Sequence, residues 1–87
     1  MKQPELQLID TIDLMTSKDY KERLKAEFMQ LEIRTDKLGK MLSDWRQGKL
    51  KFEPTCDYGL LMKQFQLMDE YQMILRVRAK IEGIDLK

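Results

Sequence analysis

Apolar side chains recur at alternating intervals of four and three residues through the first half of the chain. The row has one polar member and consists of Leu24, Phe28, Leu31, Thr35, Leu38, Leu42 and Trp45. This spacing predicts a helix with a heptad seam along one face. The segment Thr16-Ser17-Lys18-Asp19 matches the acidic form of the capping box, and Gly48 suits the left-handed position that follows a helix. The pattern therefore predicts a helix over residues 17–47, about 45 Å long at about 1.5 Å per residue.

A second amphipathic segment follows a short loop that contains Pro54, which prevents a helix from running through. Asp57 or Thr55 can cap the new helix, and Gly83 is a natural stop, so we expect it over about residues 57–82. This segment carries two neighbouring rows rather than one. The first row is Leu61, Phe65, Met68, Gln72, Leu75 and Ala79, and the second is Leu60, Gln64, Leu67, Tyr71, Ile74, Arg78 and Ile81.

The first fifteen residues have a shorter pattern of their own. Leu6, Ile9 and Ile12 recur every three residues, and Pro4 suits a first helical turn. We expect a helical arm over residues 1–15, followed by a hairpin over residues 16–87. Long helices joined by a short loop pack as antiparallel neighbours. The predicted fold is therefore all-α: a long antiparallel two-helix hairpin with a short N-terminal helical arm.

Both long helices carry more apolar surface than a two-helix hairpin can bury. Side chains off the main row of the first helix are Ala26, Met29, Ile33 and Met41. A chain of 87 residues buries only a modest core, and its single cysteine, Cys56, cannot form an intrachain disulfide. Surplus apolar faces would lie in water in a monomer. We therefore expect a homo-oligomeric helical bundle, most commonly of closed symmetry.

Composition narrows the class of protein. The chain has 16 basic and 15 acidic residues, a net charge of +1, and no histidine. Histidine-based catalysis, multi-cysteine zinc sites and the Glu-x-x-His dimetal site are therefore not expected. We predict neither an enzyme nor a metal or cofactor site. Alternating charges along the helices are interpreted as solvated faces with paired side chains.

A net charge this close to zero is not typical of proteins that bind DNA or RNA polymers, because such proteins carry a basic stripe on their surface. No apolar run approaches 18 residues, so we expect no membrane contact. Residues 1–5 lack a signal-peptide pattern, and a lone thiol suits a reducing compartment. We expect a cytoplasmic protein.

Three further features each have two interpretations. Cys56 could be a reactive thiol near a helix N-terminus, although a half-buried loop residue is the simpler view. The seven methionines could form an adaptable groove, or fill gaps in an oligomer core. Gly39 interrupts the first long helix, which suggests either close approach of a ligand or neighbouring helix, or a tolerated surface position.

Basic and aromatic side chains form the most informative set. Arg34 and Lys37 lie three residues apart on the first long helix, and Arg78 interrupts an apolar row of the second. An arginine in such a row needs an anionic partner, which could be a carboxylate such as Glu27 or a ligand phosphate. Tyr20 and Tyr71 could stack on a nucleobase. Salt bridges and aromatic packing between helices explain the same residues without a ligand.

The two helices also carry a pattern that resembles a known family. Their residues read Tyr20-x-x-Arg23-Leu24-x-x-Glu27-x-x-x-Leu31-x-x-Arg34-x-x-Lys37-Leu38-x-x-x-Leu42 and Leu60-Leu61-x-x-Gln64-x-x-x-Met68-x-x-Tyr71-x-x-x-Leu75-x-x-Arg78. Over about residues 17–86 the chain is similar to small phage proteins built on the helical hairpin of anti-CBASS and anti-Thoeris sponges. It also resembles small proteins related to a crAss-like phage product.

The resemblance implies a function in the cytoplasm of an infected bacterium. Such sponges are homo-oligomers, hexameric in the anti-CBASS branch, that hold cyclic nucleotide immune signals without cleaving them. The signal is a cyclic di- or oligonucleotide, or one of the cyclic ADP-ribose type. The positions here that match the ligand-binding character of the family are Tyr20, Arg34, Thr35, Lys37, Tyr71 and Arg78.

Two other functions remain open. The surplus apolar faces could hold a different protein, which would make the chain a structural or protein-binding hairpin with no small-molecule ligand. A nucleic-acid accessory role is a weaker alternative, because the net charge is close to zero.

Overall fold

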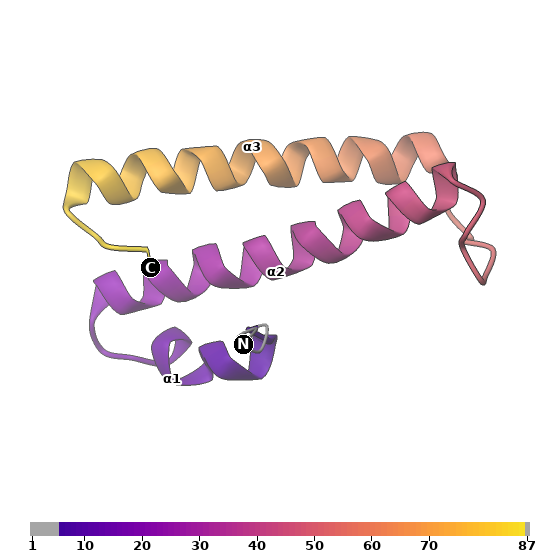
Figure 1. The fold of residues 1–87 in the computed structure, drawn as a ribbon. Coiled ribbons are helices and arrows are strands. Elements are labelled where there is room, and N and C mark those ends of the chain that lie inside the picture. Colours follow the sequence, from indigo (N-terminus) through magenta and orange to yellow (C-terminus); the bar gives the residue numbers. More distant parts are fainter. Residues whose placement is uncertain (1–5, 87) are drawn as a thin grey trace, which may run out of the picture.

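The computed structural model describes residues 6–86, and every regular element in that range is helical. A 3-10 turn, Leu8–Thr11, leads into the short helix α1, Ile12–Met15. The long helices α2, Tyr20–Arg46, and α3, Tyr58–Glu82, follow. In Figure 1, α2 and α3 run antiparallel and are joined at one end by the loop over residues 47–57. The prediction of an all-helical fold is confirmed for residues 6–86, and Pro4, expected in the first turn of the arm, lies outside the described residues.

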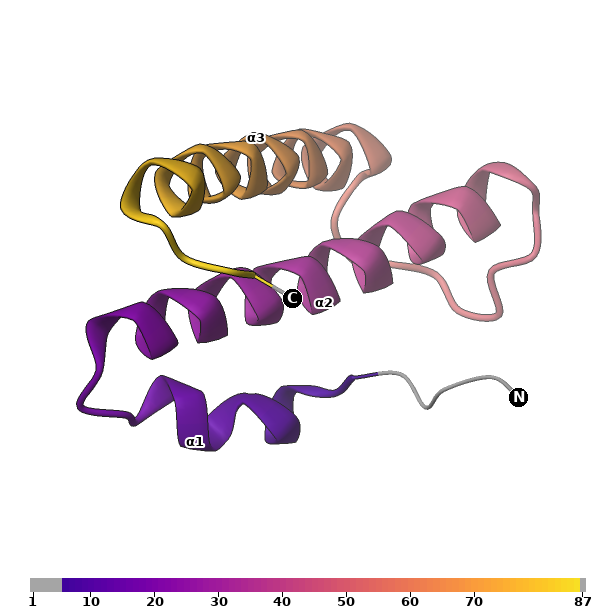
Figure 2. The same cartoon turned by 60° about the vertical axis from the view of Figure 1, so that its left-hand side comes forward.

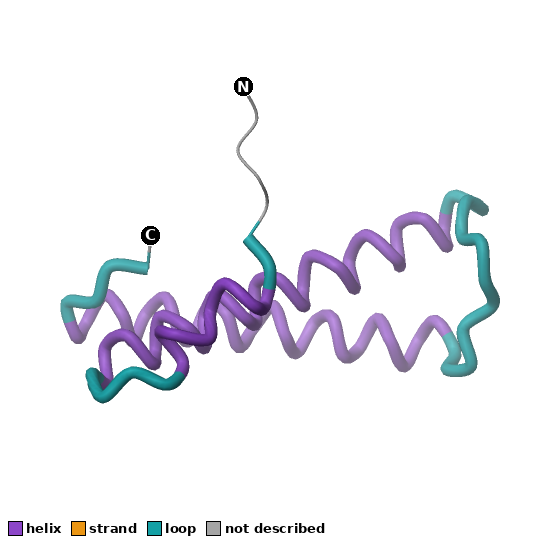
Figure 3. Tube along the Cα trace, turned by 90° about the horizontal axis from the view of Figure 1, so that it is seen from below, coloured by secondary structure: helices purple, strands orange, loops and turns teal. Residues whose placement is uncertain are grey.

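The helices form three layers with α2 in the middle. Figure 2 shows the arm folded back along one side of α2, while α3 lies along another side. Figure 3 shows that α2 and α3 are inclined to each other rather than parallel. Among the described helices, α3 packs against α2 alone, whereas α2 also contacts the 3-10 turn and α1. The outer face of α3 is therefore not covered by any other helix of the described chain.

The ends of the long helices follow from their capping residues. Asp19 caps α2 by accepting a hydrogen bond from the Lys21 backbone N–H at 2.9 Å, so the helix begins three residues later than the predicted start at residue 17. Ser17 instead supports the approach to the helix, because its hydroxyl accepts from the Asp19 N–H and donates to Glu22. Gly48, with a φ of 72°, follows the end of α2.

At α3, Asp57 accepts a hydrogen bond from the Leu60 N–H at 2.7 Å, and Gly83 adopts a φ of 71° just past the last turn. Asp57 therefore caps the start of the helix and Gly83 ends it, as the sequence predicted. The helix spans residues 58–82, against an expected 57–82.

The core lies along the predicted seam between the two long helices. Its buried apolar side chains are Leu24, Phe28, Leu31 and Leu42 from α2 and Leu75 and Ala79 from α3. Leu38 and Trp45, the other members of the row, are half-buried. At the loop end, the Trp45 ring meets the Tyr58 ring edge-on, with 5.3 Å between the ring centroids. The periodicity of the sequence therefore identifies the packed face of α2 correctly.

The arm is attached to α2 by a buried hydroxyl. Thr11 is fully buried, donates to the Leu8 carbonyl at 2.7 Å and accepts from the Gln30 side-chain amide at 2.9 Å. Ala26, one turn before Gln30 and off the α3 seam, is also buried. Part of the surplus apolar surface of the first long helix is thus covered within the chain, which sequence analysis did not anticipate.

Gly39 lies where a side chain of α3 comes close to the backbone of α2. A Cβ atom at this position would lie 2.8 Å from Cε1 of the Phe65 ring, closer than side-chain atoms pack. The interpretation of Gly39 as a point of close approach by a neighbouring helix is confirmed, and the helix that approaches is α3.

We expect Gly39→Ala to lower the free energy of unfolding. Overpacking typically costs about 1–3 kcal/mol, more than the roughly 1 kcal/mol that alanine gains in helix propensity. In a Phe65→Leu background, which removes the ring, the same substitution should instead raise the free energy of unfolding by up to about 1 kcal/mol. Urea denaturation followed by circular dichroism measures both effects. The same sign of effect in both backgrounds would contradict the close contact.

Candidate functional site

Four polar or aromatic residues line one edge of the interface between α2 and α3. Tyr20 and Glu27 lie two turns apart on α2, and Tyr71 and Arg78 lie two turns apart on α3. Because the helices are antiparallel, Tyr20 lies opposite Arg78 and Glu27 lies opposite Tyr71. The Arg78 guanidinium donates to the Tyr20 hydroxyl at 2.6 Å, and the Tyr71 hydroxyl donates to the Glu27 carboxylate. We call these four residues the polar edge.

The charge of Arg78 is held by its neighbours on the polar edge. The hydrogen bond and attraction from Tyr20 raise the pKa of Arg78, and Glu82 and Glu27 raise it further, so the guanidinium stays cationic. Its Nε atom lies 3.6 Å from a Glu82 carboxylate oxygen. One arginine therefore faces two carboxylates, so this group carries net negative charge before any other cation is considered. An anionic ligand bound here would need additional cations.

The two tyrosine rings of the polar edge remain accessible. Tyr20 is 45% exposed and Tyr71 is 42% exposed, although each hydroxyl is hydrogen-bonded. The hydroxyl groups thus fix the positions of the rings while leaving ring surface open. Exposed aromatic faces of this kind can stack on a flat base.

A shallow apolar groove of about 430 Å³ runs along α3 from the loop to the polar edge. Its lining is formed by Cys56, Leu60, Leu61, Lys63, Gln64, Leu67, Met68 and Tyr71. Tyr71 thus belongs to both the groove and the polar edge. This groove was not predicted from the sequence. The second apolar row of α3 contains Leu60 and Leu67, which line the groove, and could have indicated it.

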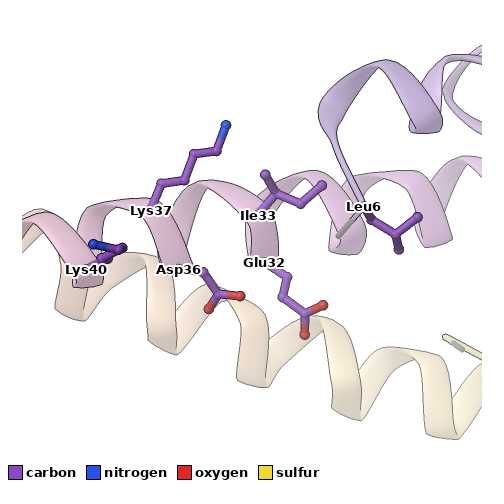
Figure 4. A pocket seen from close by; sticks show the side chains of 6 residues that line it. All are labelled: Leu6, Glu32, Ile33, Asp36, Lys37 and Lys40. Carbon is purple, nitrogen blue, oxygen red and sulfur yellow. The ribbon is translucent and has the colours of Figure 1, made fainter. Parts of the chain in front are cut away.

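A second pocket, of about 300 Å³, lies between the arm and α2 and is shown in Figure 4. Its lining is formed by Leu6, Glu32, Ile33, Asp36, Lys37 and Lys40. In Figure 4 the Lys37 side chain points away from the carboxylates of Glu32 and Asp36. Lys40 is also within 3.0 Å of Asp44. Two lysines and two acids balance each other here, so the pocket has no strong preference for anions.

The structure brings three of the six predicted site residues together, namely Tyr20, Tyr71 and Arg78. Arg34 lies one heptad beyond Glu27 on α2, is exposed, and makes no ion pair with any residue between 6 and 86. Lys37 lines the pocket beside the arm instead of the polar edge.

Thr35 occupies a different environment from the other predicted residues. It is only 4% exposed, and its hydroxyl donates to the Leu31 carbonyl at 2.7 Å. The expectation of a hydroxyl available to a ligand does not fit this packing. Thr35 is the polar member of a heptad seam, and a threonine there satisfies its own hydroxyl within the helix.

Metal-ligand clusters and reactive thiols were also sought among the described residues. Residues 6–86 contain no cluster of three or more possible metal ligands of the cysteine, aspartate and glutamate types. Cys56 is an exposed free thiol at the end of the apolar groove. In the same range, no helix is long and apolar enough to cross a membrane.

Comparison with known proteins places the chain in a family. Neither the curated proteins nor the solved structures gave a significant match. The family model described as Sequestin matches residues 18–81, which include α2, the loop and nearly all of α3. The matched region thus contains the whole polar edge and leaves out the arm. The chain belongs to the Sequestin family of phage cyclic-nucleotide sponges, in agreement with the resemblance drawn from its sequence.

Proposed function

We propose that this protein is a phage anti-defence protein that binds a cyclic nucleotide immune signal and sequesters it without cleavage. It acts as a homo-oligomer in the cytoplasm of the infected bacterium. The observation that carries the proposal is the polar edge, where the rings of Tyr20 and Tyr71 lie exposed beside the Arg78 guanidinium in a Sequestin-family chain. The ligand class is a cyclic di- or oligonucleotide, or a cyclic ADP-ribose.

The chemistry of the polar edge matches the parts of such a ligand. The exposed tyrosine rings can stack on the bases, which contributes roughly 1–3 kcal/mol per base in single-stranded nucleic acids. The Arg78 guanidinium can bind a phosphate through two parallel hydrogen bonds. Because Tyr20 already fixes its orientation, little side-chain entropy is lost when a phosphate binds.

The charge balance also points to a second source of cations. Glu27 and Glu82 offset the charge of Arg78, so a ligand with two phosphates requires more positive charge than the polar edge holds. Arg34 continues the α2 row of Tyr20 and Glu27 and has no anionic partner among the described residues. We therefore assign Arg34 to the phosphates together with Arg78. Lys37, on the arm side of α2, is a candidate only for a ligand shared with another copy.

Sequestration needs no catalytic group, because the captured signal is only withheld from its effector. Binding has to be tight enough to compete with the effector, and any ligand released from the protein has to be chemically unchanged. The alternative function, a structural or protein-binding hairpin without a small-molecule ligand, is favoured by the exposed apolar face of α3. The two functions differ in their response to nucleotides.

A panel of cyclic dinucleotides, cyclic trinucleotides and cyclic ADP-ribose isomers should contain a ligand that raises the melting temperature. At about one hundred times its dissociation constant, a ligand adds roughly 2.7 kcal/mol of stability. For a chain of this size that corresponds to a rise of roughly 10–20 °C. Differential scanning fluorimetry measures the shift. If no member of the panel shifts the melting temperature and a single partner protein copurifies, the structural hairpin is the better explanation.

Arg78→Ala should weaken binding of the ligand found in that panel by about 10- to 100-fold, the range expected for a lost charge-assisted hydrogen bond. Arg76→Ala is the matched control, because Arg76 lies two residues away on the same helix and pairs instead with Glu32 and the Phe28 ring. This control should keep the affinity within about three-fold of the parent chain. Isothermal titration calorimetry gives both affinities, and equal losses in the two variants would argue against the polar edge.

Thr35→Val should leave the affinity unchanged within about two-fold. Valine keeps the shape of threonine, and the Thr35 hydroxyl is buried and bonded to the Leu31 carbonyl rather than offered to solvent. The same calorimetric titration tests this expectation. A large loss of affinity would mean that α2 and α3 separate when the ligand binds.

A further inference from the structure

Arg23 lies next to the polar edge, although it takes part in none of its hydrogen bonds. It is one turn from Tyr20 and one turn from Glu27 on α2, so the three side chains are neighbours on the helix surface. Arg23 is exposed and forms no ion pair with a carboxylate between residues 6 and 86. A cation without a carboxylate partner in this range therefore stands beside Tyr20.

One hydrogen bond holds the Arg23 guanidinium in place. Its Nη1 group donates to the Ser17 carbonyl at 2.9 Å, in the turn between the arm and α2. The carboxylates of this turn are engaged elsewhere. Asp19 accepts from the Lys21 backbone N–H, and Glu22 accepts from the Ser17 hydroxyl. Because a guanidinium has five N–H donors, most of those of Arg23 remain available to an anion.

The arm contributes to this arrangement through Ser17. The Ser17 N–H donates to the Leu14 carbonyl at 3.3 Å, near the end of α1. The arm itself is held against α2 by the hydrogen bond between Thr11 and Gln30. In Figure 1 the turn that follows the arm, the start of α2 and the end of α3 meet at one end of the molecule. The position of the arm therefore affects the position of the Arg23 guanidinium.

We propose that Arg23 is a further phosphate-binding residue of the candidate site, positioned by the arm through the Ser17 carbonyl. The inference rests on the proposed function, because the phosphates are those of its cyclic nucleotide. Arg23 supplies part of the positive charge that the polar edge lacks. The site then holds more arginines than carboxylates, namely Arg23, Arg34 and Arg78 against Glu27 and Glu82.

Arg23 and Arg78 approach Tyr20 from two sides. The Arg78 guanidinium reaches the Tyr20 hydroxyl from α3. Leu24, four residues after Tyr20, is buried in the seam between the helices, so Arg23, three residues after it, lies on the side of Tyr20 that faces away from α3. Phosphates on either side of a base stacked on the exposed Tyr20 ring would each meet a guanidinium.

Isothermal titration calorimetry of the full-length chain tests the contact, with cyclic di-AMP, cyclic di-GMP, cyclic ADP-ribose and inorganic pyrophosphate as probes. Arg23→Ala should weaken binding of the tightest probe by about 10-fold or more, as expected for a lost charge-assisted hydrogen bond. Lys21→Ala is the matched control, because Lys21 is exposed in the same turn but lies on the opposite side of the helix. It should keep the affinity within about three-fold of the parent chain. A loss of affinity in Arg78→Ala but not in Arg23→Ala would overturn the proposal.

Thr11→Val tests the positioning role of the arm at a distance from the site. Valine keeps the shape of threonine but removes the buried hydroxyl that accepts from Gln30, so the attachment of the arm is weakened. The substitution should lower the affinity of the parent chain by about three-fold and leave that of Arg23→Ala unchanged, because the two effects share one path. Equal losses in the two backgrounds would remove the positioning role.

The outcomes separate this inference from the proposed function. Nucleotide binding that is unaffected by Arg23→Ala would keep the proposed function and overturn the inference. Binding of pyrophosphate alone, lost in Arg23→Ala, would remove the proposed function and keep Arg23 as a residue that binds phosphate groups. Absence of binding by all four probes would overturn both.

Discussion

The packing of α2 against α3 is the constraint on which the rest of the molecule depends. Phe28 and Leu31 meet Leu75 in one buried cluster, and the close contact of Phe65 with Gly39 limits how near the helices come. A slip of one turn along this seam would separate the pairs that form the polar edge. The apolar core therefore sets the register, and the register places the aromatic rings and the guanidinium side by side.

Periodicity and capping residues were enough to predict the hairpin, because both act through local physical rules. The heptad seam, the cap at Asp57 and the left-handed Gly83 follow directly from the order of residues. The path of the arm could not be predicted, since it depends on long-range contacts such as the hydrogen bonds that the Gln30 amide donates to Thr11 and Met15. The later start of α2 reflects a choice between neighbouring capping residues that the sequence pattern does not resolve.

The candidate site was predictable only in part, for a physical reason. Tyr20, Tyr71 and Arg78 could be selected by residue type, but their assembly depends on helix register. Lys37 and Thr35 were selected in the same way, and the rotation of α2 turns one toward the arm pocket and the other into the core. Residue type identifies chemistry, whereas the packed face of each helix decides which groups share a site.

Two features of the single chain are incomplete: the polar edge lacks the positive charge that a ligand with two phosphates requires, and the outer face of α3 lacks a cover within residues 6–86. The central claim is that copies of the chain together retain an intact cyclic nucleotide. Native mass spectrometry of the protein purified from cells with an active signalling cyclase tests this most directly. The account predicts an oligomer with added ligand mass, and denaturation should release the unmodified cyclic nucleotide. A ligand-free protein, or one that releases only linear products, would contradict it.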